Sequence, residues 1–190
     1  GADHDVIAIG QEVGSAAALS LNGALLVATN SDLTTAASLL AVLQGSLTSP
    51  VGAALLQLDP TTFSGTNVVT IGAGASLTLT NPAGSLFSDV GGTITTTGDG
   101  VAITGGGDLT SAGTGALVQF NGSTVNVGTD NTHSHFFAVD GAGSTATLAG
   151  RLLSATNTAI TINAGTAGPV NALVEALNGG QITSTGTVPL

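Results

Sequence analysis

The segment from Asp130 to Asp140 holds the densest group of side chains in this sequence that could do chemistry. It contains Asp130, His133, His135 and Asp140. His133 and His135 are two residues apart, so on a β-strand their imidazoles would share one face. Two imidazoles and a nearby carboxylate are ligands that Zn²⁺ and Cu²⁺ accept. A long solvated turn explains the same residues without a metal. We prefer the turn, and we expect no metal and no other cofactor.

Asp89, Asp99 and Asp108 are a second group of acids, at intervals of ten and nine residues. Ca²⁺ needs several oxygens that converge on one point. The glycine-rich calcium repeat of some β-helices is absent, and the run from Gly105 to Asp108 matches only a fragment of it. We therefore expect no calcium site.

Catalysis is not favoured by the remaining polar residues. Carbohydrate cleavage, the usual reaction of a β-helix, needs paired carboxylates and groups that hold sugars. Glu12 and Glu175 lie in different contexts, Arg151 is the sole basic residue apart from histidine, and Trp and Tyr are absent. No G-x-S-x-G nucleophile motif occurs beside a histidine. We expect that the protein is not an enzyme.

The composition excludes several classes of partner. Among 190 residues, 42% are hydrophobic and 6% are charged, and the net charge is −10. So acidic a chain does not favour nucleic acid or an anionic membrane surface. No apolar run reaches the ~18 residues of a membrane span. A chain without Cys, Met or Lys is typical of an exported product, so we expect an extracellular location.

An apolar motif of the form φ-φ-x-φ, in which φ is an apolar residue, recurs eleven times at a mean spacing of about 17 residues. Ten copies begin at Val6, Leu25, Leu39, Leu55, Val68, Leu86, Leu117, Phe136, Leu152 and Leu173, and a shortened copy covers Val101 to Ile103.

Between these copies lies a polar motif with a single apolar residue at its centre. The central residues are Leu33, Leu47, Phe63, Leu77, Ile94, Leu109, Val125, Ala146, Ile162 and Ile182. Gly, Asn, Asp and Ser, the residues typical of turns, separate the two motifs.

The spacing predicts an all-β protein built as a stack of coils. A unit of ~17 residues is too short for a strand–helix crossover, which takes ~30 residues, but it accommodates two short strands and tight turns. Alternation along a strand directs positions two and four of the apolar motif, and the centre of the polar motif, inward. We therefore predict a single-stranded β-solenoid, or parallel β-helix, of about eleven coils of ~17 residues. It would form a single domain over residues 1–190.

Two features of this prediction have alternatives. Residues 31–45 and 170–180 could instead form helices, with Ser31 as an N-cap and Gly45 or Gly179 as a stop signal. The first position of the apolar motif either turns inward at a corner or forms an exposed stripe suited to lateral filament contacts. Phe120 and Phe137 hold inward positions in successive predicted coils, so we expect them to lie close together.

Three phrases of the repeat are similar to known sequences. GSLTSPVGAALLQLD, GDLTSAGTGALVQFNGSTVNVG and STATLAGRLLSATN resemble the repeat regions of bacterial secreted β-helix proteins of the filamentous-haemagglutinin-like and FecR-domain kinds. The resemblance covers nearly the whole chain. It implies a β-helix fold, export, and a surface, adhesive or matrix-forming role, and it brings no catalytic motif.

The predicted solenoid lacks a recognisable cap at both ends. The first apolar motif begins at Val6, and residues 187–190 follow the last polar motif where earlier coils open a new apolar motif. Open ends present unpaired N–H and C=O groups that favour pairing with another chain. We expect head-to-tail self-assembly through an interface of Val6, Ile7, Ile9, Ile182, Val188, Pro189 and Leu190. The alternative is that the chain is part of a longer solenoid whose caps lie outside this sequence.

The expected function is therefore that of a structural subunit of an extracellular surface or matrix filament at a bacterial cell surface. The alternative is a secreted ice-binding or adhesive β-solenoid, because the outer positions of the polar motif form columns of Ser, Thr and Asn, as in Thr62-Phe63-Ser64 and Thr93-Ile94-Thr95. Threonine ladders also stabilise a sheet in any protein, so the columns alone do not decide between the two.

Overall fold

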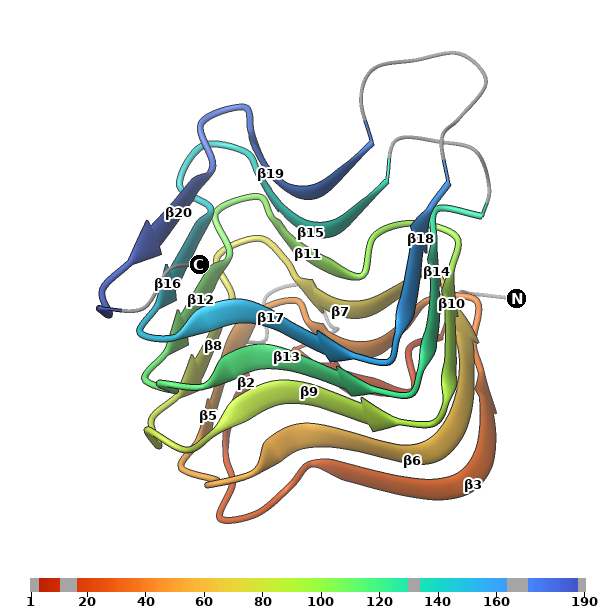
Figure 1. The fold of residues 1–190 in the computed structure, drawn as a ribbon. Coiled ribbons are helices and arrows are strands. Elements are labelled where there is room, and N and C mark those ends of the chain that lie inside the picture. The colour runs from red at the N-terminus through yellow and green to blue at the C-terminus, as the bar shows by residue number, and fades with distance from the viewer. Residues whose placement is uncertain (1–3, 11–16, 130–133, 164–170, 188–190) are drawn as a thin grey trace.

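The chain forms a β-solenoid of about five turns, in which parallel strands from successive turns stack on one another (Figure 1). The structure is a computed structural model, and it describes residues 4–10, 17–129, 134–163 and 171–187. No helix occurs among these residues. The all-β class and the solenoid architecture predicted from the two motifs are confirmed.

Each turn has four walls. Wall A is the sheet of β1 (Ile7–Ile9), β4 (Ser38–Val42), β7 (Asn67–Ile71), β11 (Val101–Thr104), β15 (His135–Asp140) and β19 (Ala172–Leu177). Wall B is the sheet of β2 (Ala17–Ser20), β5 (Gly45–Ser49), β8 (Ser76–Leu79), β12 (Asp108–Ser111), β16 (Thr145–Leu148) and β20 (Gln181–Ser184).

Walls C and D belong to one bent sheet, because its two long strands, β3 (Leu26–Thr34) and β6 (Ala54–Gly65), run through the corner between them. The first halves of these two strands build wall C with β9 (Ser85–Val90), β13 (Ala116–Asn121) and β17 (Arg151–Thr156). Their second halves build wall D with β10 (Thr93–Thr96), β14 (Thr124–Val127) and β18 (Ala159–Ile162).

The predicted number of coils is wrong by a factor of about two. Residues in register along wall A are Ile7, Leu40, Val69, Val101, Phe137 and Val174, so successive turns take 33, 29, 32, 36 and 37 residues. The ~17-residue unit is half a turn, because apolar motifs alternate between walls A and C and polar motifs alternate between walls B and D. One motif pair brings the chain only to the opposite side of the core.

The inward side chains form a continuous apolar core. Positions two and four of the apolar motif are buried through the middle of the stack, as in Leu40, Val42, Leu56 and Leu58. The predicted phase of the strands is therefore correct in these turns. In wall D the last polar motif is displaced, since Ile160 rather than Ile162 is in register with Val125.

The first residue of the apolar motif lies at a corner and turns into the core. Seven of these residues are at most 5% exposed: Leu39, Leu55, Val68, Leu86, Leu117, Phe136 and Leu152. At the two ends of the stack, Val6 and Leu173 are 42% and 45% exposed. The corner interpretation is thus confirmed within the stack, and the exposed lateral stripe is excluded there.

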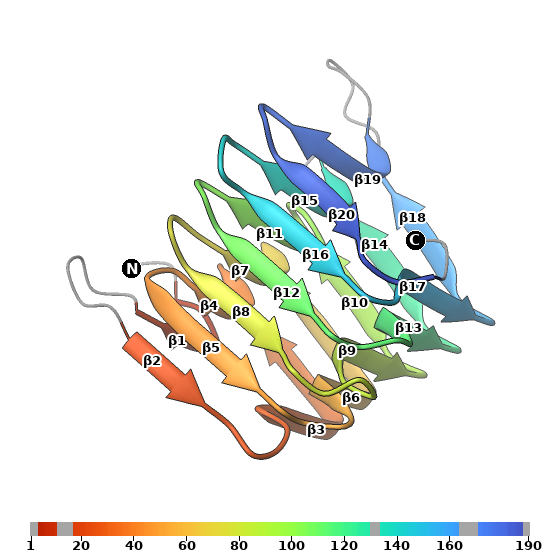
Figure 2. The same ribbon diagram turned by 90° about the vertical axis from the view of Figure 1, so that its left-hand side faces the viewer.

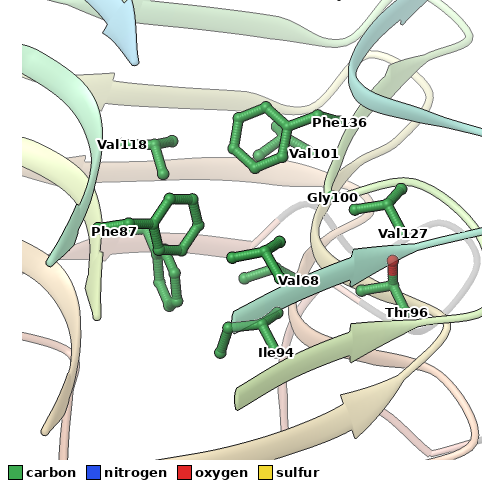
Figure 3. Close-up of a pocket in the computed structure, with 11 residues that line it drawn as sticks. Val68, Phe87, Ile94, Thr96, Gly100, Val101, Val118, Val127 and Phe136 are labelled. Atoms are coloured by element: carbon green, nitrogen blue, oxygen red, sulfur yellow. The ribbon is translucent and has the colours of Figure 1, made fainter. Parts of the chain in front are cut away.

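Phenylalanines from facing walls meet inside the core (Figure 3). The ring of Phe120 makes edge-to-face contacts with Phe87 and Phe136, at centroid distances of 5.7 and 5.8 Å. The structure records no ring contact between Phe120 and Phe137, although Phe137 is fully buried. Phe136 takes the contact because, as the corner residue of wall A, it reaches across the core to wall C. A small apolar cavity of about 10 Å³ remains beside these rings.

The two candidate helices are strands in the structure. The end of β3, all of β4 and the start of β5 lie within residues 31–45, and β19 lies within residues 170–180. Both segments pair in register with the turn next to them. Stacking buries their apolar residues against neighbouring turns, and this tertiary gain overrides their modest helix propensity.

Candidate functional site

A column of hydrogen bonds runs along the corner where wall D meets wall A. Side-chain oxygens there accept hydrogen bonds from backbone N–H groups of the next turn. Asp5 Oδ1 accepts from Ser38, Asn67 Oδ1 accepts from Asp99, and Asp99 Oδ1 accepts from His135, at 2.8, 2.8 and 2.7 Å. This corner ladder links most of the stack, and it places a histidine among carboxylates near the last turn.

His135 lies between two carboxylates that come from the turns on either side of it. Its Nδ1 is 3.2 Å from Asp99 Oδ1, and its Nε2 is 2.7 Å from Glu175 Oε2. The imidazole side chain is 6% exposed, whereas those of Asp99 and Glu175 are 22% and 30% exposed. We call these three residues the acid–histidine cluster.

Burial raises the pKa of Asp99 above its ordinary value. The hydrogen bond from the His135 backbone N–H and the charge of the His135 ring partly oppose this rise, and the carboxylate of Asp140 adds to it. Asp99 therefore keeps a proton to a higher pH than an exposed aspartate does.

The predicted metal ligands are not brought together in the part of the chain that the structure describes. Asp130 and His133 lie outside the described residues. His135 and Asp140 occupy opposite ends of β15, and Asp140 accepts a hydrogen bond of 2.7 Å from the Asn178 side chain. Across the described ranges, no three His, Asp or Glu side chains are grouped as metal ligands. Because carboxylates engage both ring nitrogens of His135, we do not carry the metal hypothesis further.

Sequence reasoning selected His135 but missed its partners. Asp99 and Glu175 are each separated from His135 by about one full turn of the solenoid. The predicted metal site combined only residues of the segment from Asp130 to Asp140. Knowledge of the ~33-residue turn would have placed these three residues in successive turns of wall A.

The three spaced aspartates lie on different sides of the solenoid, so their oxygens do not converge as Ca²⁺ requires. Asp89 lies on wall C, Asp99 is part of the corner ladder, and Asp108 begins β12 in wall B. Asp108 accepts hydrogen bonds from the hydroxyls of Thr110 and Thr145.

Asp89 is a carboxylate inside the apolar core. It is 0% exposed and in register with Leu58 and Phe120, and neither of its carboxylate oxygens has a hydrogen bond of normal geometry. Burial raises its pKa, and the nearby Ser123 hydroxyl and Gly92 amide lower it in part. Asp89 therefore favours its neutral, protonated form.

Gly92 leaves the space that this carboxyl group fills. A Cβ at Gly92 would lie 2.3 Å from Asp89 Oδ1. In the adjacent turns the same corner position holds Thr61 and Ser123, whose hydroxyls donate to the carbonyl oxygens of Ala28 and Asp89 at 3.0 and 3.1 Å. The carboxyl group of Asp89 thus fills space that a side chain at position 92 would need, and we assign Asp89 a structural role.

The outer surface of wall B carries two regular columns of polar residues. The first column is Ser46, Ser76, Asp108, Thr145 and Gln181, and the second is Thr48, Thr78, Thr110, Thr147 and Thr183. The second column is threonine in all five strands from β5 to β20. In wall D the matching column is mixed, with Thr34, Ser64, Thr95, Asn126 and Thr161.

The two ends of the stack expose residues that are buried elsewhere. Figure 2 shows β1 and β2 at one end and β19 and β20 at the other. In the last turn, Leu173 and Val174 are 45% and 39% exposed. They line a hollow of about 300 Å³ together with Leu152, Leu153 and Ala155.

The predicted assembly residues are distributed over both ends. Val6 is 42% exposed and Ile7 is half-buried in the first turn, where Ile9 is 6% exposed, and Ile182 is half-buried in the last turn. Val188, Pro189 and Leu190 lie outside the described residues.

No family model, curated protein or solved structure matches the chain. Within the described ranges, no helix is long and apolar enough to cross a membrane.

Proposed function

We propose that this protein is a structural subunit of an extracellular surface or matrix filament and assembles head to tail through its solenoid ends. The observation that carries the proposal is the exposure of core side chains at the last turn. In the described part of the chain, no further strand pairs with the outer edges of β17, β18, β19 and β20, and open edges beside apolar residues are the arrangement that recruits a further strand.

The first and last described turns have matching patterns. The described strands begin with β1 in wall A and end with β20 in wall B, half a turn beyond a whole number of turns. An incoming copy therefore continues the stack when it is rotated by about half a turn, so that its β1 follows β17 and its β3 follows β19.

This arrangement places apolar residues of the incoming copy on apolar residues of the last turn. Ile7 stacks on Leu153, Leu26 on Val174, and Leu19 on Ile160. The contact joins different surfaces of the two copies, so repetition gives a linear polymer.

The extracellular location rests on the sequence. The chain has no Cys, Met or Lys, and its repeat phrases resemble those of bacterial secreted β-helix proteins. A stack of backbone-paired strands with a continuous core suits a protein that bears load or resists proteolysis outside the cell.

Electron microscopy and sedimentation at rising protein concentration test the proposal. The wild type should form linear polymers, and Ile7→Asp should abolish them because it buries a carboxylate at the joint. The matched control is Gln119→Asp, which places the same charge on an exposed site in the middle of wall C. A wild type that stays monomeric, or an Ile7→Asp variant that polymerises normally, would contradict head-to-tail assembly.

The all-threonine column of wall B supports ice binding as a second candidate function. A parallel sheet repeats these hydroxyl and methyl groups every ~4.8 Å. Wild-type protein should then show thermal hysteresis, and Thr110→Leu should reduce it while Thr95→Leu in wall D leaves it unchanged. An absence of thermal hysteresis in the wild type would exclude this candidate.

A further inference from the structure

The acid–histidine cluster needs one proton more than a neutral imidazole and two ionised carboxylates provide. A neutral imidazole has one donor nitrogen and one acceptor nitrogen. Here both ring nitrogens lie within hydrogen-bond distance of a carboxylate oxygen, at 3.2 and 2.7 Å. An ionised carboxylate only accepts, so a neutral ring cannot satisfy both contacts.

Three arrangements of protons satisfy the geometry. The ring of His135 is an imidazolium between two carboxylates, or Asp99 is protonated and donates to Nδ1 while Nε2–H donates to Glu175, or Glu175 is protonated and donates to Nε2 while Nδ1–H donates to Asp99. In all three arrangements the cluster holds one proton more than a neutral ring and two carboxylates, and in the first two Nε2 carries a proton. The raised pKa of Asp99 is consistent with a proton kept on the Asp99 side.

The cluster joins the last turn of wall A to the two turns before it. Asp99 precedes β11, His135 begins β15, and Glu175 lies in β19. On its inner side β19 has incomplete packing, since Leu173 and Val174 are 45% and 39% exposed. The contact between Glu175 and His135 adds a side-chain link to the backbone pairing of β19 with β15 and to the hydrogen bond from Asn178 to Asp140.

We propose that β19 is held in place by a proton-dependent hydrogen-bonded cluster and detaches locally when the cluster loses its proton. The shared proton is lost as the pH rises. Nε2 or Nδ1 then faces a carboxylate with a lone pair, and the contact becomes repulsive. If the local opening of β19 releases one proton, the equilibrium constant for opening rises about tenfold for each pH unit over the range in which the cluster loses that proton.

Among the residues that the structure describes, the charged groups around His135 offer no substitute for that proton. Asp99 faces the ring from the turn before, Glu175 faces it from β19, and Asp140 lies on β15 itself and acts on Asp99. All three are acidic. Arg151, the chain's one Lys or Arg, lies on β17 in wall C, on the other side of the core.

Hydrogen exchange at individual amides, measured by NMR on monomeric protein between pH 5 and 9, tests the proposal. After correction for intrinsic exchange rates, the opening constant of Val174, Glu175 and Ala176 should rise about tenfold per pH unit through the titration. Amides of β7 should show no such rise. Long-range ¹⁵N spectra of the imidazole at the acidic end should show which ring nitrogens of His135 carry a proton.

Two variants complete the test. His135→Gln cannot titrate, so its β19 amides should exchange with an opening constant that does not depend on pH. His4→Gln, which removes the described histidine of the first turn, should keep the wild-type slope. A flat wild-type profile or a sloping His135→Gln profile would overturn the proposal.

Discussion

Asp89 shows how a single residue in the core makes stability depend on pH. Its folded-state pKa is raised above the ordinary value of 3.8 because burial disfavours the charged form. Between that ordinary value and the raised value, the folded chain keeps a proton that the unfolded chain has lost. Stability therefore falls as the pH rises through this window, and the loss is complete above the raised pKa.

We predict that Asp89→Asn removes this pH dependence and stabilises the protein at neutral pH. The asparagine has the same shape and no charge to bury. Denaturant unfolding of wild type and variant from pH 3 to 8 measures the difference in unfolding free energy, which should grow with pH. Asp32→Asn, at an exposed site, is the control and should give a constant difference. A constant difference for Asp89→Asn would show that Asp89 is not held in its neutral form.

Phe137 tests the inward phase of wall A. Its side chain is fully buried and in register with the inward residues Val101 and Val174 of the adjacent turns. Phe137→Ala should lower the free energy of unfolding by about 3–5 kcal/mol, through lost burial and the cavity left behind. Val90→Ala, at a 43% exposed site, should change it by no more than about 0.5 kcal/mol. Equal effects of the two substitutions in denaturant unfolding would contradict the assigned phase.

Individual positions were predictable where alternation decides them. Leu56, Val118 and Phe137 follow from the motif alone. The burial of Asp89 does not follow from the motif. It depends on Gly92, which has no side chain and therefore leaves space for the Asp89 carboxyl group at the corner that follows β9. His135 was recognised as a residue that could do chemistry, but its partners Asp99 and Glu175 come from other turns and require the correct turn length.

At the scale of elements, the motifs predicted strands and their inner faces but not the length of a turn. Apolar motifs in walls A and C look alike, so the sequence repeats every half turn while the structure repeats every turn. One signal separates the two halves. The third position of the polar motif is threonine in wall B from Thr48 to Thr183 and varies in wall D.

The strands also predict resistance to trypsin. Arg151, the one trypsin site, lies within β17, which pairs in register with β13, and the following Leu152 is 5% exposed. A strand held in this way cannot enter a protease site without local unfolding. Prolonged digestion of the folded protein should leave it intact by mass spectrometry, whereas urea-unfolded protein should be cut after Arg151. Rapid cleavage of the folded protein would show that β17 is not stably paired.

At the scale of the whole molecule, we propose that the two ends of the solenoid join to build a filament. Among the described residues, apolar side chains are exposed at both ends, and the half-turn offset between the first and last described strands is the basis of the joint that we propose. Each copy contributes about five and a half turns of strands that are ~4.8 Å apart, which gives a rise of ~26 Å per subunit.

Helical reconstruction of the polymer by cryo-electron microscopy tests this claim most directly. The account predicts a continuous solenoid with a rise of ~26 Å and a rotation near 180° per subunit, so that wall A of one copy continues wall C of the copy before it. Polymers joined side by side, or protein that remains monomeric at every concentration, would contradict it.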